Sequence, residues 1–231
     1  MTTQRQVKKL LSPLVEAYTD VELVGRWLYL KPVRHVLRAI LIERTGEADR
    51  FRPWWAVAPL CEPQKAFPLN WATQITSPAR RLWFWKDDDT PFNLAASIEL
   101  RALPSLRAIE TLDDFVAFAD SSERFSLTAF RYYHLRSLGV DAARGDLEGA
   151  RKTCAELVGG RTKWSVPSMR DDFDRVTGEL CPLLAANDRT GMARLLHQWE
   201  AYTVEKLKIG HIYEPTPFPL ELMTADEGPT R

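Results

Sequence analysis

The sequence predicts an α+β protein in which an N-terminal helix and an antiparallel sheet of about four strands are followed by C-terminal α-helical hairpins. Two observations lead to this prediction. Strand-like alternation with β-branched and aromatic residues fills much of residues 21–86, whereas helical periodicity dominates residues 7–18 and returns after residue 89. The chain of 231 residues is 45% hydrophobic and 27% charged, which is the composition of a globular protein with its own core.

We expect three regions along the chain. Residues 1–104 should form the helix and an aromatic-rich sheet, and residues 105–212 should form helical hairpins packed on that sheet. Residues 213–231 should form an extended tail, because its closely spaced prolines cannot continue a helix. The side chains expected to hold the tail against the body are Phe218, Leu220 and Leu222.

A single apolar stripe predicts the N-terminal helix. Apolar side chains recur at the spacing i, i+3, i+4, i+7, i+8 and i+11, and they are Val7, Leu10, Leu11, Leu14, Val15 and Tyr18. Polar residues occupy the other face, so the helix should bury one side against the sheet.

Four strands are predicted at residues 21–31, 33–43, 54–60 and 81–86, with turn-forming residues at 44–50. In the second strand Arg38 shares a face with Val36, Ile40 and Ile42. The first connections are too short for a crossover helix, and the sheet should therefore be antiparallel.

Six of the eight tryptophans lie in this sheet region, namely Trp27, Trp54, Trp55, Trp71, Trp83 and Trp85. Packing in the core is the usual role of such side chains. The alternative is that one sheet face stays open as an aromatic binding surface, because tryptophan is enriched at interface hot spots. The candidate binding residues are Trp54, Trp55, Trp83 and Trp85, with Arg81 in a basic rim around them.

The C-terminal half predicts two helical hairpins. Residues 127–138 should form a helix that Gly139 ends, followed by a helix at residues 147–158, and a second pair should span residues 169–184 and 192–202. Two acidic turns, each followed by a glycine, repeat after 42 residues, from Asp146 to Asp188 and from Gly149 to Gly191. This period resembles the tetratricopeptide class of helical repeats over residues 125–207, which implies an architecture of stacked hairpins only.

Charge, hydropathy and cysteine count narrow the function classes. Lysine plus arginine and aspartate plus glutamate both number 31, which predicts no nucleic-acid partner, and no apolar run is long enough to predict a membrane partner. The three cysteines, Cys61, Cys154 and Cys181, are odd in number and lack close spacing, so we expect no disulfide framework and a reducing compartment. The N-terminus lacks the pattern of a secretory signal, and a cytoplasmic location is the resulting expectation.

The sequence contains no P-loop, dinucleotide-binding, serine-hydrolase or zinc-protease motif, and we expect no cofactor. Asp87, Asp88 and Asp89 offer oxygen ligands for a hard cation, but a solvated turn is the favoured interpretation and no metal site is predicted. A thiol and imidazole pair between Cys154 or Cys181 and His134 or His197 is a further, less favoured alternative.

The first helix leads into Val24-Gly25-Arg26-Trp27-Leu28-Tyr29 and two more strands. This order resembles the start of small bacterial domains of unknown function, some of them thought to act as immunity or accessory proteins. The resemblance implies a stoichiometric role, so the leading hypothesis is a non-catalytic bacterial protein-binding protein that uses the aromatic sheet face or the groove beside it. The alternatives are a metal-dependent or acid–base enzyme acting on a small or phosphorylated substrate, and a helical adaptor that uses only its C-terminal half.

Overall fold

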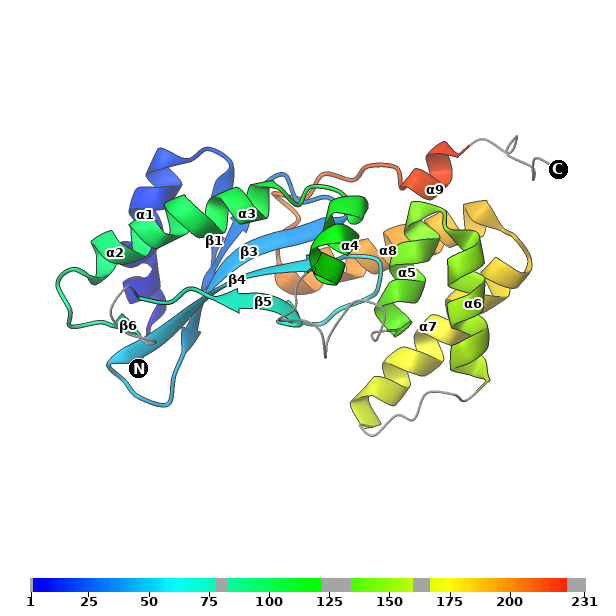
Figure 1. The fold of residues 1–231 in the computed structure, drawn as a ribbon, viewed down its shortest axis with the longest axis horizontal. Coiled ribbons are helices and arrows are strands. Elements are labelled where there is room, and N and C mark those ends of the chain that lie inside the picture. Colours follow the sequence, from blue (N-terminus) through cyan, green and yellow to red (C-terminus); the bar gives the residue numbers. More distant parts are fainter. Residues whose placement is uncertain (1, 78–82, 122–133, 160–166, 224–231) are drawn as a thin grey trace. The chain divides into compact units, whose positions relative to one another are not determined.

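The computed structural model describes residues 2–77, 83–121, 134–159 and 167–223 (Figure 1). The chain forms two compact units, each assembled from separate segments. Unit 1 contains Met1–Ala58, Phe67–Phe115 and Lys208–Glu214, and unit 2 contains Pro59–Ala66, Val116–Leu207 and Pro215–Arg231. The predicted α+β fold is confirmed, because an N-terminal helix and an antiparallel sheet precede a series of helices.

The first helix, α1 (Gln4–Ala17), follows the predicted stripe. Its four buried side chains are Val7, Leu10, Leu11 and Leu14. A capping box starts the helix, because the backbone N–H of Gln6 donates to Thr3 Oγ1 at 3.2 Å and the backbone N–H of Thr3 donates to Gln6 Oε1 at 2.9 Å.

Among the described residues the sheet has six strands rather than about four. They are β1 (Val21–Val24), β2 (Trp27–Leu30), β3 (Val36–Arg44), β4 (Arg50–Pro59), β5 (Trp71–Gln74) and β6 (Trp83–Phe84). The order is β1-β2-β3-β4-β5, and β6 pairs with β4. The predicted strand at residues 21–31 is in fact a hairpin, because Val24 pairs with Trp27 and Gly25 has a φ of 66° in the turn between them.

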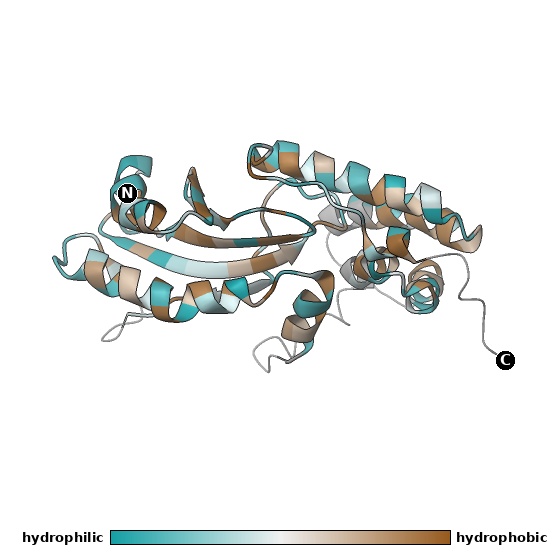
Figure 2. Cartoon of the chain, turned by 90° about the horizontal axis from the view of Figure 1, so that it is seen from above, coloured by the Kyte–Doolittle hydropathy of each residue, from teal (hydrophilic) through white to brown (hydrophobic). Residues whose placement is uncertain are grey.

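Strand β3 forms the centre of unit 1. Every residue from Val36 to Ile42 is buried, although alternate side chains point to opposite faces of the strand. A continuous row of three helices, α2 (Thr90–Ser97), the π-helix η1 (Ile98–Ala102) and α3 (Leu103–Arg107), runs along the sheet (Figures 1 and 2). The row buries Leu94, Ile98, Leu103 and Leu106.

Unit 2 is built from helices α5 (His134–Arg144), α6 (Leu147–Val158), α7 (Pro167–Ala185) and α8 (Arg189–Leu207). The predicted 42-residue repeat corresponds to the same N-terminal cap at the start of two helices, α6 and α8. Asp146 Oδ1 accepts a hydrogen bond from the Gly149 N–H at 2.9 Å, and Asp188 Oδ1 accepts one from the Gly191 N–H at 2.8 Å. A Cβ atom at either glycine would lie so close to the capping carboxylate that the carboxylate would have to shift, so both positions favour glycine in this geometry.

The prediction that Gly139 ends a helix is wrong. Gly139 lies inside α5, and the helix ends at Arg144, before Gly145 with its φ of 84°. A Cβ atom at Gly139 would overlap the backbone carbonyl of Cys61. Gly139 therefore allows two backbones to approach closely, a role that looks the same as a helix stop in the sequence. The first part of the predicted helix, residues 127–133, lies outside the described residues.

The expectation that the cysteines form no disulfide is also wrong. Cys154 on α6 and Cys181 on α7 are disulfide-bonded, with Cα atoms 6.0 Å apart. The spacing of 27 residues gave no signal, because only the packing of α6 against α7 brings the two side chains together. Neither sulfur is a free thiol for the suggested imidazole pair, and the remaining thiol, Cys61, is buried, which raises its pKa well above the usual value.

The described part of the tail, residues 213–223, is partly extended and contains a short helix, α9 (Pro219–Leu222). Phe218 and Leu220 are buried as predicted, whereas Leu222 is exposed. His197 of α8 lies 2.8 Å from Glu221 and 3.4 Å from Glu200. The hydrogen bond to Glu200, reinforced by Glu221, raises the pKa of His197.

The disulfide should stabilise unit 2 by shortening its unfolded chain. Replacement of Cys154 and Cys181 by serine should lower the free energy of unfolding by about 2–4 kcal/mol, as expected for a loop of this length. Helical circular dichroism in denaturant measures this change, and dithiothreitol should destabilise the wild type but not the double variant. Recovery of three alkylatable thiols from unreduced, unfolded protein would contradict the bond.

Burial raises the pKa of Asp141 on α5 to about 6, with further upward contributions from Asp146 and Asp120 that Arg144 opposes. The unfolded pKa is about 3.9, so the stability contributed by the protonated form is complete below about pH 4 and is lost as the pH rises through about 6. Asp141→Asn should therefore raise the free energy of unfolding at pH 7 by about 1–2 kcal/mol after solvent screening.

The same substitution should have little effect at pH 4, and denaturant titrations at both pH values measure the difference. The matched control is Glu148→Gln, which removes an exposed carboxylate of α6. An effect of Asp141→Asn that is the same at both pH values would contradict a raised pKa of Asp141.

Candidate functional site

Two of the tryptophans predicted to bind a partner are tied to the N-terminal end of β4. Trp83 is only 2% exposed, and its Nε1 donates to the Ile75 carbonyl at 2.9 Å. The half-buried Trp85 lies with its ring centroid 4.2 Å from that of Phe51, and its Nε1 donates to Thr2 Oγ1 at 3.1 Å. Trp83 thus belongs to the core of unit 1 and offers little surface to a partner.

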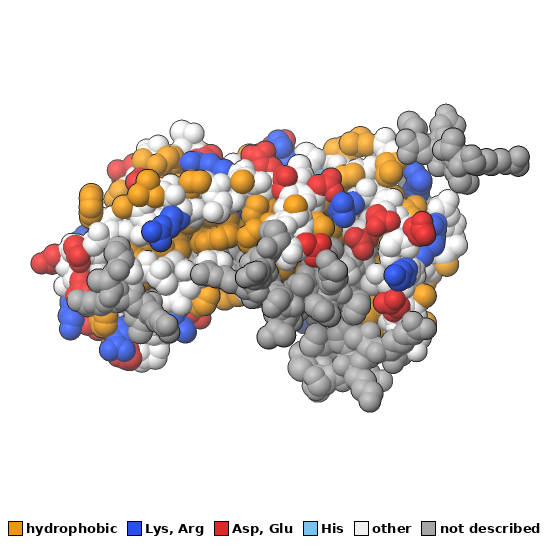
Figure 3. Space-filling view, in the orientation of Figure 1, with side chains coloured by type: hydrophobic (Ala, Val, Ile, Leu, Met, Phe, Trp, Pro, Cys, Tyr) orange, Lys and Arg blue, Asp and Glu red, His pale blue; other side chains and the backbone are white. Residues whose placement is uncertain are grey.

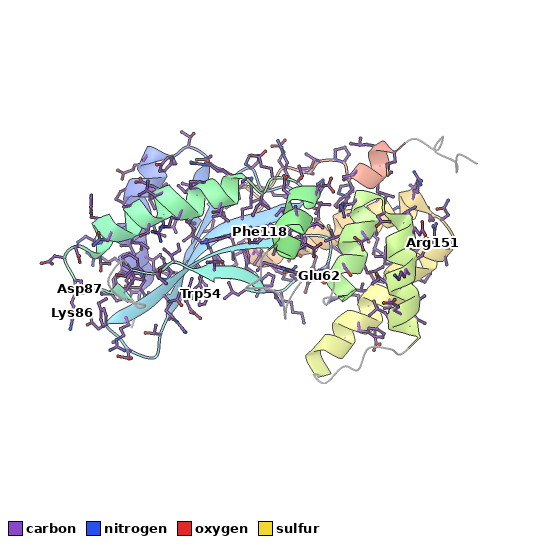
Figure 4. All side chains as sticks on the ribbon, in the orientation of Figure 1. Trp54, Glu62, Lys86, Asp87, Phe118 and Arg151 are labelled. Atoms are coloured by element: carbon purple, nitrogen blue, oxygen red, sulfur yellow. A yellow bond between two sulfur atoms is a disulfide. The ribbon has the colours of Figure 1, made fainter. Side chains whose placement is uncertain are left out.

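Trp54 and Trp55 lie on opposite faces of β4, as strand alternation predicts, and both are half-buried. Trp54 Nε1 donates to Glu43 Oε2 at 2.9 Å, and Arg52 Nε lies 3.0 Å from the same oxygen (Figure 4 labels Trp54). Arg81 lies outside the described residues. The structure therefore does not gather the four tryptophans into one surface.

The acidic run forms a turn between β6 and α2 (Figure 4 labels Lys86 and Asp87). The Thr90 N–H donates to the Asp87 carbonyl at 3.0 Å, and Asp89 Oδ2 accepts from Asn93 Nδ2 at 2.8 Å. Asp88 and Asp89 are exposed. Within the described ranges, no group of three metal-ligating side chains is arranged to hold an ion.

A different site is found in unit 1, where the β1–β2 hairpin, the start of β3 and the end of α3 meet. The hollow has a volume of about 250 Å³. It is lined by Asp20, Leu30, Lys31, Pro32, Arg34, Val36, Arg38, Arg107 and Glu110, and we call it the arginine pocket. Four of these nine residues carry a positive charge and two carry a negative charge.

Arg38 is the unusual member of the arginine pocket. It lies on the central strand β3 and is only 8% exposed, a rare position for a charged side chain. Its Nη2 donates to the Pro32 carbonyl at 3.3 Å, whereas its Nε is buried and has no hydrogen-bond partner among the residues that the structure describes. Burial lowers the pKa of Arg38, with Glu110 acting in the opposite direction.

The other cations of the pocket have carboxylate partners at hydrogen-bond distance. Arg107 binds Asp20 through two bonds of 2.8 and 3.0 Å. The other two pairs are Arg34 with Glu214 at 3.1 Å and Lys31 with Glu22 at 3.3 Å. Arg38 differs, because its nearest carboxylate oxygen in the described part of the chain, Glu110 Oε1, is 3.9 Å from Nη1.

These contacts define what the pocket can do. A buried guanidinium with an unused donor needs an acceptor, and the best match for its planar donors is a carboxylate or phosphate oxygen pair. The doubly bonded Asp20–Arg107 pair keeps its charges, because Arg107 lowers the pKa of Asp20 and Asp20 raises that of Arg107. The arrangement suits the binding of an oxyanion.

No protein-family model, curated protein or solved structure matches this chain. No helix among the described residues is long and apolar enough to span a bilayer. Basic and acidic side chains are interspersed on the face shown in Figure 3, as the equal numbers of positive and negative residues lead one to expect.

The different burial of two tryptophans gives a direct test of their roles. Trp83→Ala should lower the free energy of unfolding by about 3–5 kcal/mol, the usual loss for a buried aromatic residue. Trp54→Ala should cost about 1 kcal/mol, because it removes a half-buried ring and one hydrogen bond to Glu43. Denaturant unfolding measures both, and equal losses would place Trp54 in the core as well.

Proposed function

We propose that this chain is a non-catalytic binding protein that holds its partner through an oxyanion seated against Arg38. The observation that carries the proposal is the guanidinium of Arg38, which lines an open hollow although the side chain is only 8% exposed, and whose nearest carboxylate oxygen among the described residues is 3.9 Å from Nη1. A buried donor without a partner costs about 1–3 kcal/mol. A bound carboxylate or phosphate group would supply a closer acceptor to this guanidinium.

The walls of the pocket support the same interpretation. Arg107 is held by Asp20, and Pro32 fixes one Nη of Arg38 through its carbonyl. Such contacts position the guanidinium before a ligand arrives, which reduces the ordering entropy lost on binding. The nearby apolar side chains of Leu30 and Val36 lower the local dielectric and strengthen any charge-assisted hydrogen bond formed there.

A protein partner remains the natural source of such a group, because aspartate, glutamate and the chain terminus all carry carboxylates. The half-buried Trp54, with Arg52 and Glu43 beside it, is a second candidate surface for a protein partner. Its indole ring is fixed by the bond to Glu43, and rigid aromatic side chains lose little entropy on binding. A stoichiometric, immunity-like or accessory role is a setting in which either surface would act.

The enzyme alternative receives less support from the geometry. A general base works best with a pKa near neutrality, yet the pocket carboxylate Asp20 has a lowered pKa because Arg107 binds it twice. In the run Asp87–Asp89, the Asp87 carbonyl accepts a hydrogen bond within a turn, and the Asp89 carboxylate accepts one from Asn93 at the start of α2. The charged residues of the arginine pocket therefore suit recognition better than proton transfer.

Substitution of Arg38 tests the proposal. Arg38→Met should abolish binding of oxyanion probes, measured by calorimetry with inorganic phosphate, sulfate and acetate at constant ionic strength. It should not lower the thermal stability, because methionine fills similar space without an unpaired buried charge. The matched control is Arg44→Met, which removes the same charge from an exposed position on the same strand.

The control variant should bind the probes as the wild type does. Equal binding by Arg38→Met and the wild type, or no heat with any probe in the wild type, would refute the proposed function.

A further inference from the structure

The balance of positive and negative side chains around the arginine pocket indicates the charge of the ligand that it would bind. The four pocket cations are accompanied by four carboxylates, of which Asp20, Glu22 and Glu214 each lie 3.3 Å or less from one of them, and Glu22 also lies 2.7 Å from His211. The fourth carboxylate, Glu110, stands 3.9 Å from Arg38 and makes no hydrogen bond to it. If Glu110 turns away, one positive charge is left without a partner, and a singly charged anion restores the balance.

The contact of Glu110 with Arg38 is loose. The Glu110 side chain is 68% exposed, so its carboxylate is largely solvated, and at 3.9 Å from Nη1 it is beyond hydrogen-bond distance. Its backbone, in contrast, is fixed, because the Glu110 N–H donates to Asp114 Oδ2 at 3.1 Å in the capping box that starts α4 (Leu112–Ser121). The neighbouring Ile109 and Leu112 are buried. Only the Glu110 side chain is therefore free to change position.

We propose that Glu110 is a resident carboxylate that stands at the entrance to Arg38 and is displaced by the carboxylate of a ligand. The inference rests on the proposed function and deepens it by naming a monoanionic carboxylate as the ligand and Glu110 as its internal competitor. The approach of Glu110 Oε1 to Nη1 marks the path by which a carboxylate oxygen reaches the guanidinium. A dianion would place excess negative charge beside Asp20, which also lines the pocket.

The Nε–H group of Arg38 provides a specific signal for the test. A buried Nε–H exchanges slowly with solvent, so its nitrogen–proton cross-peak should be visible by NMR in the full-length protein, and its absence in Arg38→Lys assigns it. Titration with acetate should shift this cross-peak, and titration with sulfate at the same ionic strength should give a weaker apparent affinity.

Glu110→Gln should tighten acetate binding about two- to fivefold, the change expected when a competing exposed ion pair is removed. The matched control is Glu99→Gln, which removes an exposed carboxylate from η1 outside the pocket and should leave the affinity unchanged.

Each result decides a separate point. Equal acetate affinity in Glu110→Gln and the wild type would overturn the role of Glu110 as competitor. Sulfate binding as tight as acetate binding would overturn the carboxylate class while leaving the oxyanion-binding function intact. Failure of both probes to shift the Arg38 signal in the wild type and in Glu110→Gln would refute the proposed function itself.

Discussion

Unit 1 is organised by one constraint, the burial of β3 on both of its faces. A strand in that position must be apolar throughout, and Val36, Leu37, Ala39, Ile40, Leu41 and Ile42 meet the requirement. Arg38 is the single charged residue within this run. Its guanidinium reaches the connection between β2 and β3, where the Pro32 carbonyl accepts one hydrogen bond and the hollow begins. The pocket is thus a consequence of placing one cation in a strand that otherwise excludes polar groups.

Unit 2 depends on a different feature, the way in which successive helices are joined. Asp146 and Asp188 each cap a helix, and a Cβ atom on the glycine three residues later would lie so close to the capping carboxylate that the carboxylate would have to shift. Capping fixes where α6 and α8 begin, but it does not determine which faces of neighbouring helices meet. For α6 and α7, the Cys154–Cys181 disulfide holds the two facing sides together, because it joins the helices covalently.

Local patterns were sufficient to predict much of the fold. The stripe of α1, the opposite orientations of Trp54 and Trp55, and the two capped helix starts follow from periodicity and short-range chemistry. Features set by contacts distant in the sequence were not predicted: the close approach at Gly139 depends on Cys61, and the disulfide depends on helix packing. For the site, the sequence placed Arg38 on an apolar face, but Asp20, Arg107 and Glu110 join it only through the tertiary fold.

The charges of the arginine pocket favour recognition over catalysis. Arginine stays protonated at any physiological pH, and the pair of Asp20 with Arg107 moves the pKa of each partner further from neutrality. Asp141, with its pKa of about 6, has the titration behaviour of an acid–base group, but its charged neighbours are Arg144, the last residue of α5, and Asp146, which caps α6. Groups that keep their charge near neutral pH can hold and orient an anion, but they exchange no proton with it. These charges fit the proposed binding role of the arginine pocket, and under that proposal the selectivity for a ligand depends on charge balance and on the displacement of the Glu110 side chain.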